Sequence, residues 1–394
     1  MGLPQLTINL RNGGLGRVAQ TDDGVAGLIL TGTAVAGKLD LNKVYALASV
    51  RDLTSYGITE ENNPLVYKDV SRFYAKAGDG AELYLLVVAQ ATTLTQMCSS
   101  ADASPIRKLI TFGKGRIRLV GINRLPAEGY NPETETHGID ADVVTALAAM
   151  QEIGQNYASQ IKPFRALIPA LYWNEQAETL YKPVEGSYNR VQVVMAADRK
   201  YGSFVSASIG EALGVYASIP VHQSSARVKN GAVNAEGMLT NGKSIEDNEA
   251  YLNMLHDAGY LIYRTFVSRN GYYYNDDPTA APLTDDYSSM AYGRVIDKAT
   301  IILYTAFISE INENIEVDED GYIPISYCKS YEGTLDNAVA VGMKGEISSF
   351  SAYVDPKQNI LSSSKMDVNC SIVPKGILRN ININLGFENP ALNQ

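Results

Sequence analysis

Runs of apolar residues alternate with stretches of helical periodicity along residues 25–250. A continuous apolar run is typical of a strand that is covered on both faces. Segments 69–78 and 140–162 instead space their apolar residues as amphipathic helices do, and the second begins at a candidate N-cap, Asp140, and ends before Pro163. Strands that alternate with helices predict a mainly parallel, helix-covered sheet. The predicted strands are VAGLILTG (25–32), KVYALAS (43–49), ELYLLVV (82–88), RIRLVGIN (116–123), FRALIPAL (164–171) and RVQVVMAA (190–197).

The pattern changes after residue 250. The stretch YLIYRTFVSRNGYYYN (260–275) predicts a hairpin, because Asn270-Gly271 is a strong turn signal. Two helices are expected next, one over 288–314 and one near 332–344.

Each end of the chain carries an alternating strand pattern set apart by turn residues. Residues 5–10 precede a glycine-rich stretch, and the alternation of 366–372 resumes at 381–387 after a turn at 374–376. An end strand without a neighbour in sequence has to pair with a sheet elsewhere, in this chain or in another. The apolar positions of these two end strands are Leu6, Ile8, Leu10, Ile381, Ile383 and Leu385, and the glycines expected to act as hinges are Gly13, Gly14, Gly16 and Gly376.

These patterns predict an α/β protein. Its helix-covered, mainly parallel sheet domain is inserted into an α+β core domain that has strand-like N- and C-terminal arms. The expected parts are an N-terminal arm and hinge (1–21), an α/β outer domain (22–250), an α+β core (251–360) and the C-terminal strands and arm (361–394).

Composition narrows the possible partners. The net charge is −10 and Lys and Arg are not clustered, so direct nucleic-acid binding is not expected. The three cysteines are widely spaced and predict neither a disulfide framework nor a Cys-based metal site. With no signal peptide pattern and no apolar run long enough to cross a bilayer, we expect a soluble, cytosolic product without membrane insertion.

The sequence offers little catalytic chemistry. The glycines at 12–16 lack the following helix that a phosphate loop needs, and Ser362 and Lys365 match S-x-x-K without its companion motifs. His137, His222 and His256 have no metal-ligand spacing, and the acidic residues at 318–320 lack the ligand pattern of a calcium loop. No cofactor, metal or catalytic residue is therefore predicted.

Tyrosine is unusually frequent, with 25 residues against 8 Phe. Tyr combines an apolar ring with a polar tip, so a contact surface and a half-buried packing role are both open for residues such as Tyr272, Tyr273 and Tyr274.

The order of elements resembles that of contractile phage tail sheath proteins, in particular the compact sheaths of Bacteroidetes-type prophages and related contractile injection systems. The resemblance covers nearly the whole chain in order of elements and rests on degenerate motifs. In the first part these are Gly24 and Gly27, Asp52 to Gly57, Val70 to Gly80 and Leu83 to Val88. In the last third they are a helix from Arg294, FSAYVDPKQN (350–359) and MDVNCSIVPKGILRNININLGF (366–387).

The resemblance implies a structural, non-enzymatic role. Sheath subunits polymerise as stacked hexameric rings around an inner tail tube, and their N- and C-terminal arms add strands to sheets in neighbouring subunits. Contraction of this helical lattice drives the tube through a target cell envelope, as in genome ejection. Further partners would be baseplate and tail terminator proteins. The expected location is the virion tail or a contractile injection particle assembled in the bacterial cytoplasm.

Two alternatives remain open. A soluble α/β enzyme, such as a hydrolase or nucleotide-dependent transferase, would have a convergent polar pocket at the carboxyl ends of the strands. A static, non-contractile tail protein would assemble but have only one tubular diameter. The terminal strands favour assembly over catalysis, and nothing in the sequence separates a contractile from a static assembly.

Overall fold

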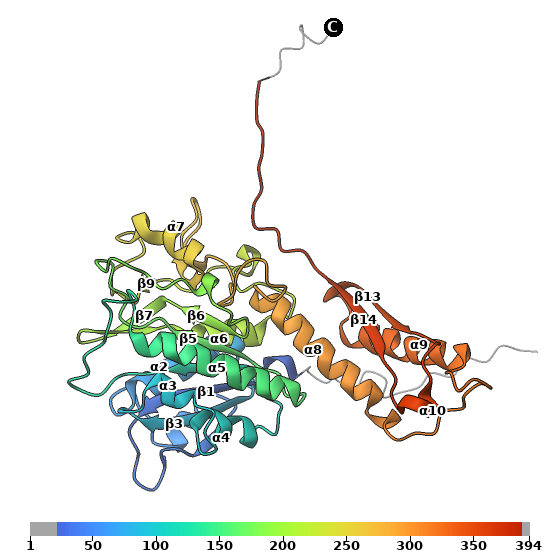
Figure 1. Ribbon diagram of the computed structural model, residues 1–394. Helices are drawn as coiled ribbons and strands as arrows, with labels where there is room; N and C mark the ends of the chain where they lie inside the picture. Colours follow the sequence, from blue (N-terminus) through green and yellow to red (C-terminus); the bar gives the residue numbers. More distant parts are fainter. Residues whose placement is uncertain (1–21, 388–394) are drawn as a thin grey trace, which may run out of the picture.

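A seven-stranded sheet forms the centre of the computed structural model, which describes residues 22–387 (Figure 1). The strand order is β10–β6–β5–β4–β1–β3–β2, and every neighbouring pair is parallel except β2–β3. This confirms the mainly parallel sheet that the apolar runs predict. The strands are β1 (Ala26–Gly32), β2 (Val44–Leu47), β3 (Leu83–Ala89), β4 (Leu119–Asn123), β5 (Arg165–Pro169), β6 (Val191–Val194) and β10 (Tyr260–Leu261).

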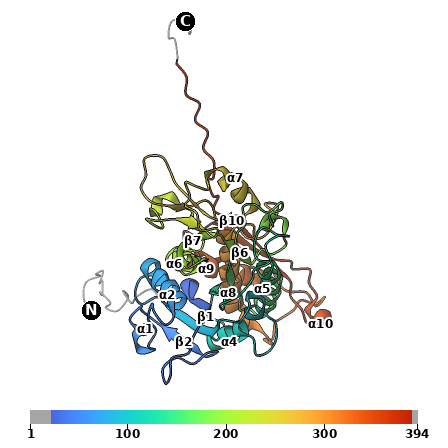
Figure 2. The same cartoon turned by 90° about the vertical axis from the view of Figure 1, so that its left-hand side faces the viewer.

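Helices cover both faces of this sheet, as the sequence predicts. In Figure 2, α2 (Pro64–Ala77) and α6 (Ile209–Ser218) lie on one side of β1, and α4 (Pro105–Phe112) and α5 (Ala141–Ser159) lie on the other. The short helix α3 (Leu94–Met97) packs against α5. Because helices cover both of its faces, β1 is buried along its whole length.

The crossing of α2 and α6 depends on a glycine. A Cβ atom on Gly210 would lie 2.0 Å from the backbone oxygen of Asp69, closer than any real contact. The absence of a side chain therefore lets the two helix backbones approach directly. On the other face of the sheet, α5 begins as predicted, with the Asp140 carboxylate accepting a hydrogen bond of 3.2 Å from the Asp142 N–H.

The predicted hairpin over 260–275 forms only in part. Tyr260–Leu261 joins the large sheet as β10, while β11 (Tyr263–Arg264) pairs antiparallel with β12 (Tyr273–Tyr274). The large sheet thus continues past residue 250, where the sequence places a domain boundary. The remaining elements of this part are α1 (Asp52–Ser55), β7 (Ala196–Tyr201), β8 (Phe204–Ala207), β9 (Met238–Leu239), α7 (Glu249–Ala258) and the short 3-10 turns η1 (Asp22–Gly24), η2 (Pro183–Glu185) and η3 (Val228–Asn230).

The elements after residue 289 extend from the sheet body on one long helix (Figure 1). We call α9, β13, α10 and β14 the C-terminal module, which α8 connects to the body. The elements are α8 (Met290–Phe307), η4 (Ile308–Glu310), α9 (Ile325–Gly342), β13 (Ile347–Val354), α10 (Ile360–Ser363) and β14 (Val368–Pro374).

Both predicted helices of this region have different bounds in the structure. The first ends at Phe307 rather than near 314, because the chain changes to a 3-10 turn and Asn312 adopts a left-handed φ of 66°. The second begins at Ile325 rather than near 332, directly after Pro324. A proline fixes its own φ and lacks an N–H, so it suits a helix start.

Buried charge joins α8 to the body. The Arg165 guanidinium, on β5, donates to both carboxylate oxygens of Asp297 at 2.7 and 3.2 Å, and Arg190 also donates to Asp297. Gly293 makes room for Arg165, because a Cβ there would lie 2.4 Å from the guanidinium carbon. The first half of α8 is therefore held rigidly against the large sheet.

The two predicted strands near the C-terminus differ in outcome. The alternation of 366–372 is confirmed as β14, which pairs with β13. Residues 381–387 form no strand with the described residues, because the segment after Pro374 is extended but lies beside none of their strands (Figure 1). The predicted N-terminal arm, with Leu6, Ile8 and Leu10, lies outside the described residues.

Candidate assembly interfaces

The small sheet β13–β14 is covered on one face only. Phe350 of β13 and Ile372 of β14 face each other and pack against the apolar cluster that includes Val339 of α9. Residues of the opposite face, such as Ser351 and Tyr353, are exposed. A two-stranded sheet of this kind is only marginally stable without further packing, so α9 supports it.

The outer edge of β13 is hydrogen-bonded to side chains of α9. The Ala352 N–H donates to the Asp336 carboxylate at 3.1 Å, and the Val354 N–H donates to the Glu332 carboxylate at 3.0 Å. Lys329 donates a further hydrogen bond to Glu332 at 2.6 Å. The hydrogen bonds from Lys329 and Val354 lower the pKa of Glu332, so its carboxylate stays charged and able to accept.

The segment after β14 returns to the body before it leaves the molecule. Arg379 donates to the Asp276 carboxylate at 2.7 Å and lies 3.8 Å from Asp277. Asp277 is fully buried and accepts from Ser289 and from the first turn of α8. Arg379 therefore fixes the point at which the C-terminal segment departs from the protein.

Beyond Arg379, an exposed apolar row alternates with a row of asparagines. Ile383 is 82% exposed and Leu385 is 96% exposed, fractions far above those of apolar residues in a folded core. Side chains of an extended chain point alternately to opposite sides, so one side of this segment is apolar and the other is polar. The apolar residues are Leu378, Ile381, Ile383, Leu385 and Phe387, and the asparagines are Asn380, Asn382 and Asn384.

A buried lysine joins the start of the described chain to the C-terminal module. Lys298 of α8 lies 2.7 Å from Asp23 and 2.7 Å from Glu346, which directly precedes β13. The two carboxylates outweigh the effect of burial and raise the pKa of Lys298. The chain that enters from residues 1–21 is therefore fixed to the same turn of α8 as the small sheet.

Further apolar side chains are exposed on α8, α9, α10 and the turn between α8 and α9. They contrast with the buried residues of β1, and exposed apolar groups of this kind are common at protein interfaces. These residues are Tyr304, Ile308, Ile311, Ile325, Val341 and Leu361.

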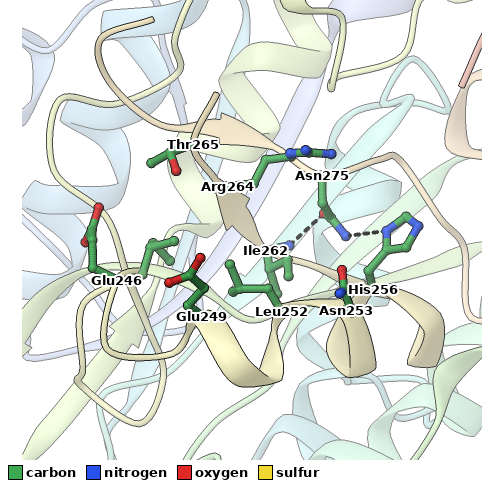
Figure 3. A pocket seen from close by; sticks show the side chains of 10 residues that line it. Glu246, Glu249, Leu252, Asn253, His256, Ile262, Arg264, Thr265 and Asn275 are labelled. Carbon is green, nitrogen blue, oxygen red and sulfur yellow. Dashed lines mark hydrogen bonds between the residues drawn. The ribbon is translucent and has the colours of Figure 1, made fainter. Parts of the chain in front are cut away.

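A hollow of about 510 Å³ lies between α7 and β11 (Figure 3). Its single histidine, His256, faces Asn275 with their nitrogens 3.1 Å apart, and Asn275 accepts from the Ile262 N–H. Glu246, Glu249 and Arg264 also line the hollow, without a serine or cysteine beside the histidine. This arrangement lacks a nucleophile–base pair.

Polar side chains at the carboxyl end of β4 are paired with one another. Asn123 donates to Asp69, while Lys68 lies 3.0 Å from Asp69 and 3.2 Å from Asp198. Burial opposes the charge of Lys68, but the Asp198 and Asp69 carboxylates outweigh it and raise the pKa of the lysine. The cluster is buried and saturates its own hydrogen bonds, so it does not form the convergent open pocket that an enzyme of this architecture would need.

Residues 22–387 contain neither a metal-binding cluster nor a membrane-spanning helix. Within that range, no group of three or more His, Cys, Asp or Glu side chains is placed to hold a metal ion. No helix among the same residues has the length and apolar character required to cross a membrane.

Several motifs have local structural roles. Lys365 pairs with Asp367, and the Asp318 carboxylate accepts from the N–H groups of Asp320 and Tyr322 within the acidic loop. Of the tyrosine triplet, Tyr273 and Tyr274 are buried, so for these two the packing role applies.

Only some of the predicted interface residues lie among the described residues. Ile381, Ile383 and Leu385 share one side of an exposed segment, and Gly376 lies in open space before it. Gly13, Gly14 and Gly16 lie outside the described residues. No sequence pattern pointed to the roles of Glu332, Asp336 and Lys298, because their partners are distant in sequence. The partner of Arg379 is distant as well. For Arg379 a signal existed, since it is a lone charge in an apolar arm.

Comparison with protein families gives matches over both parts of the chain. Residues 3–278 match the DUF2586 N-terminal domain, and residues 286–392 match the DUF2586 C-terminal domain. Among curated protein sequences, none matches this chain.

Chains from solved structures of contractile sheaths and of a baseplate share this fold. The helical sheath of the anti-feeding prophage in its contracted state has a TM-score of 0.64 at 16% identity, covering 98% of this chain and 100% of that chain. A chain from the six-fold symmetrised baseplate of the same particle has a TM-score of 0.60 at 15% identity, covering 98% and 99%. The sheath complex of an extracellular contractile injection system, PVC, in its contracted state has a TM-score of 0.56 at 12% identity, covering 98% of each chain.

Proposed function

Because the chain belongs to the DUF2586 family and has the fold of contractile sheath proteins, we propose that it is a structural subunit of a contractile sheath. In this proposal it polymerises as stacked hexameric rings around an inner tube and is anchored at a baseplate. Contraction of the lattice then drives the tube through a target cell envelope.

The observation that carries this proposal is the C-terminal segment. A soluble monomer has no use for a segment whose apolar row is almost fully exposed, as it is for Ile383 and Leu385. Strand addition to a sheet of a second copy would bury that row and satisfy the backbone at the same time. The N-terminal alternation at Leu6, Ile8 and Leu10 supports the same role at the other end of the chain.

A head-to-tail joint of this kind is heterologous, so repeating it generates a ring or a helical tube rather than a closed pair. Rigid-body rotation of subunits on persistent joints is one of the established ways in which assemblies switch state. The buried Arg165–Asp297 pair supports this, because it makes the sheet body and α8 move together. The glycines Gly13, Gly14, Gly16 and Gly376 are proposed to absorb the rotation.

Negative-stain electron microscopy of the purified full chain, with a solution mass measured alongside, tests the proposal. We expect hollow, ridged tubes of uniform width, made of six-fold rings. A deletion of residues 1–16 should leave a folded subunit that forms no tubes. Normal tubes from that deletion would contradict the arm model, and a monodisperse monomer in the presence of tube and baseplate proteins would contradict the sheath role.

A second diameter distinguishes contraction from static assembly. Tubes assembled on an inner tube should be narrower than tubes formed by the subunit alone. If both preparations have one diameter, the protein is a static tail component.

A further inference from the structure

The two edges of the small sheet are not equivalent. A strand can be added to a sheet only where N–H and C=O groups are free to pair, and exposed edges of this kind are a known route to unwanted association. At β13 the outward N–H groups of Ala352 and Val354 already donate to the Asp336 and Glu332 carboxylates. A second chain could pair there only after these two side chains moved away.

The same hydrogen bonds show in which direction the backbone N–H and C=O groups of β14 point. In an antiparallel pair, directly opposite residues either exchange both hydrogen bonds or both point away. Ala352 points away from β14, since its N–H donates to Asp336, so the opposite residue, Cys370, points away from β13. Ile372, two residues further along, has the same orientation. Among the described residues, β14 pairs with β13 alone.

The edge of β14 also has the right side chains for the C-terminal segment. Cys370 and Ile372 lie on the face whose other members, such as Phe350, pack towards α9, whereas Ser371 lies on the solvent face. An added strand would place its apolar row beside Ile372 and its asparagine row beside Ser371. Residues 380–387 have this alternation and form no strand with any described residue of their own chain.

The segment reaches another copy more readily than its own sheet. After Pro374 the chain runs to the Arg379–Asp276 ion pair and then extends away from β14 (Figure 1). Folding back onto β14 would require this ion pair to break. A second copy is therefore the source of the strand.

Taking strand addition from the proposed function, we propose that Glu332 and Asp336 close the β13 edge of the small sheet, which leaves β14 as the edge that receives residues 380–387 of a second copy. This deepens the proposed function and rests on it for the identity of the strand. We call Glu332 and Asp336 the guards. By closing the β13 edge before assembly they leave each subunit with one receiving edge, so that chains join in one register and on one side.

Disulfide trapping with a synthetic peptide tests the choice of edge. The full chain offers Cys370 on β14 as an exposed thiol, while Cys98 and Cys328 are buried. The matched position on β13 is Ala352, directly opposite and on the same face, which becomes Ala352→Cys in a Cys370→Ser background. The probe is a peptide of residues 377–387 that carries Ile381→Cys, Ile383→Cys or Leu385→Cys.

With the guards intact, Cys370 should trap the peptide at least fivefold more than Ala352→Cys. When Glu332→Ala and Asp336→Ala are added, trapping at Ala352→Cys should rise to within twofold of that at Cys370. Glu332→Gln with Asp336→Asn keeps an acceptor oxygen at each position and should keep the β13 edge closed. Glu319→Ala removes an exposed acid elsewhere and should change nothing.

Three results would overturn the inference. Equal trapping at both edges with the guards intact would show that the acids close nothing. Unchanged trapping at Ala352→Cys in the double alanine variant, with its melting temperature intact, would show the same. Preferential trapping at Cys370 of a peptide of residues 3–13 carrying Ile8→Cys would assign the edge to the other end of the chain.

The outcome is separable from the sheath proposal. If the full chain never forms tubes but Cys370 traps the peptide selectively, the edge assignment holds and the sheath role fails. If tubes form but the peptide is trapped at β13, the sheath role holds and the edge assignment fails.

Discussion

The seven-stranded sheet and the small sheet β13–β14 differ in how much of each the chain itself covers. β1 of the seven-stranded sheet is buried at every position, with helices on both faces. β14 of the two-stranded sheet is partly or fully exposed at every position, and one of its edges pairs with nothing in the described chain. The centre of the large sheet is covered by its own chain, whereas the small sheet has the geometry of a structure that other chains finish. Stability and assembly should therefore respond to different mutations.

The largest expected effect on stability comes from loss of the buried ion pair between β5 of the large sheet and α8. Asp297→Ala would leave Arg165, whose side chain is 1% exposed, without its carboxylate partner. Removal of one partner from a buried ion pair typically costs about 3–5 kcal/mol. Urea denaturation of the variant should show a loss of this size in the free energy of unfolding.

The matched control lies directly before β14 of the small sheet. Asp367→Ala removes an exposed ion pair with Lys365 and should lower the free energy of unfolding by less than about 1 kcal/mol. Equal losses in the two variants would break the contrast between the sheets.

The pH dependence of stability sharpens the comparison. Burial raises the pKa of Glu211, on α6, to about 7. A raised folded-state pKa means that the stabilisation is complete below the ordinary pKa of a glutamate and is lost as the pH rises through about 7. The free energy of unfolding should therefore fall between pH 5 and pH 8, by up to about 3 kcal/mol from this residue.

Glu211→Gln should flatten that slope. Burial also raises the pKa of Asp277, so part of the slope should remain. Glu332 has the opposite effect, because its pKa is lowered in the folded protein. Its stabilisation of the small sheet is present above the ordinary pKa of a glutamate and is lost as the pH falls below it. An unchanged slope in the glutamine variant would show that Glu211 is charged in the folded protein at neutral pH.

The smallest expected effect on stability is in the C-terminal segment. Ile383→Asp changes a side chain that is 82% exposed and should shift the free energy of unfolding by less than about 0.5 kcal/mol. It should nevertheless abolish tubes in electron micrographs, because a charge would enter the apolar row of the added strand. Asn382→Asp places the same charge on the polar row and should leave tubes intact; loss of tubes in both variants would mean that charge alone, not the apolar row, is responsible.

The covered sheet could be predicted from the sequence because burial leaves a direct mark. ELYLLVV at 82–88 is apolar apart from its first residue, Glu82, and it forms β3, which lies between β1 and β2 in the large sheet. Short elements are harder to predict from sequence. Tyr260 and Leu261 pair with β6 in the large sheet and not with residues 273–274, which pair with β11.

The small sheet was predicted only in part. Apolar and polar residues alternate clearly in β14. In β13 the sequence is ISSFSAYV, and its three serines make the strand hard to recognise because only one of its faces is covered. The roles of Glu332 and Asp336 could not be predicted, since they depend on how α9 lies along a strand that comes later in the chain. A helix surface with two acids four residues apart is otherwise an ordinary solvated face.

The Arg379–Asp276 ion pair has a mechanical consequence. Residues 375–379 run from the end of β14 to the body, where Asp277 caps the start of α8. Tension applied to residues 380–387 reaches Arg379 first and passes into the large sheet before it reaches β14. The ion pair thus transfers a pulling force on residues 380–387 to the large sheet, so that the force does not separate β14 from β13.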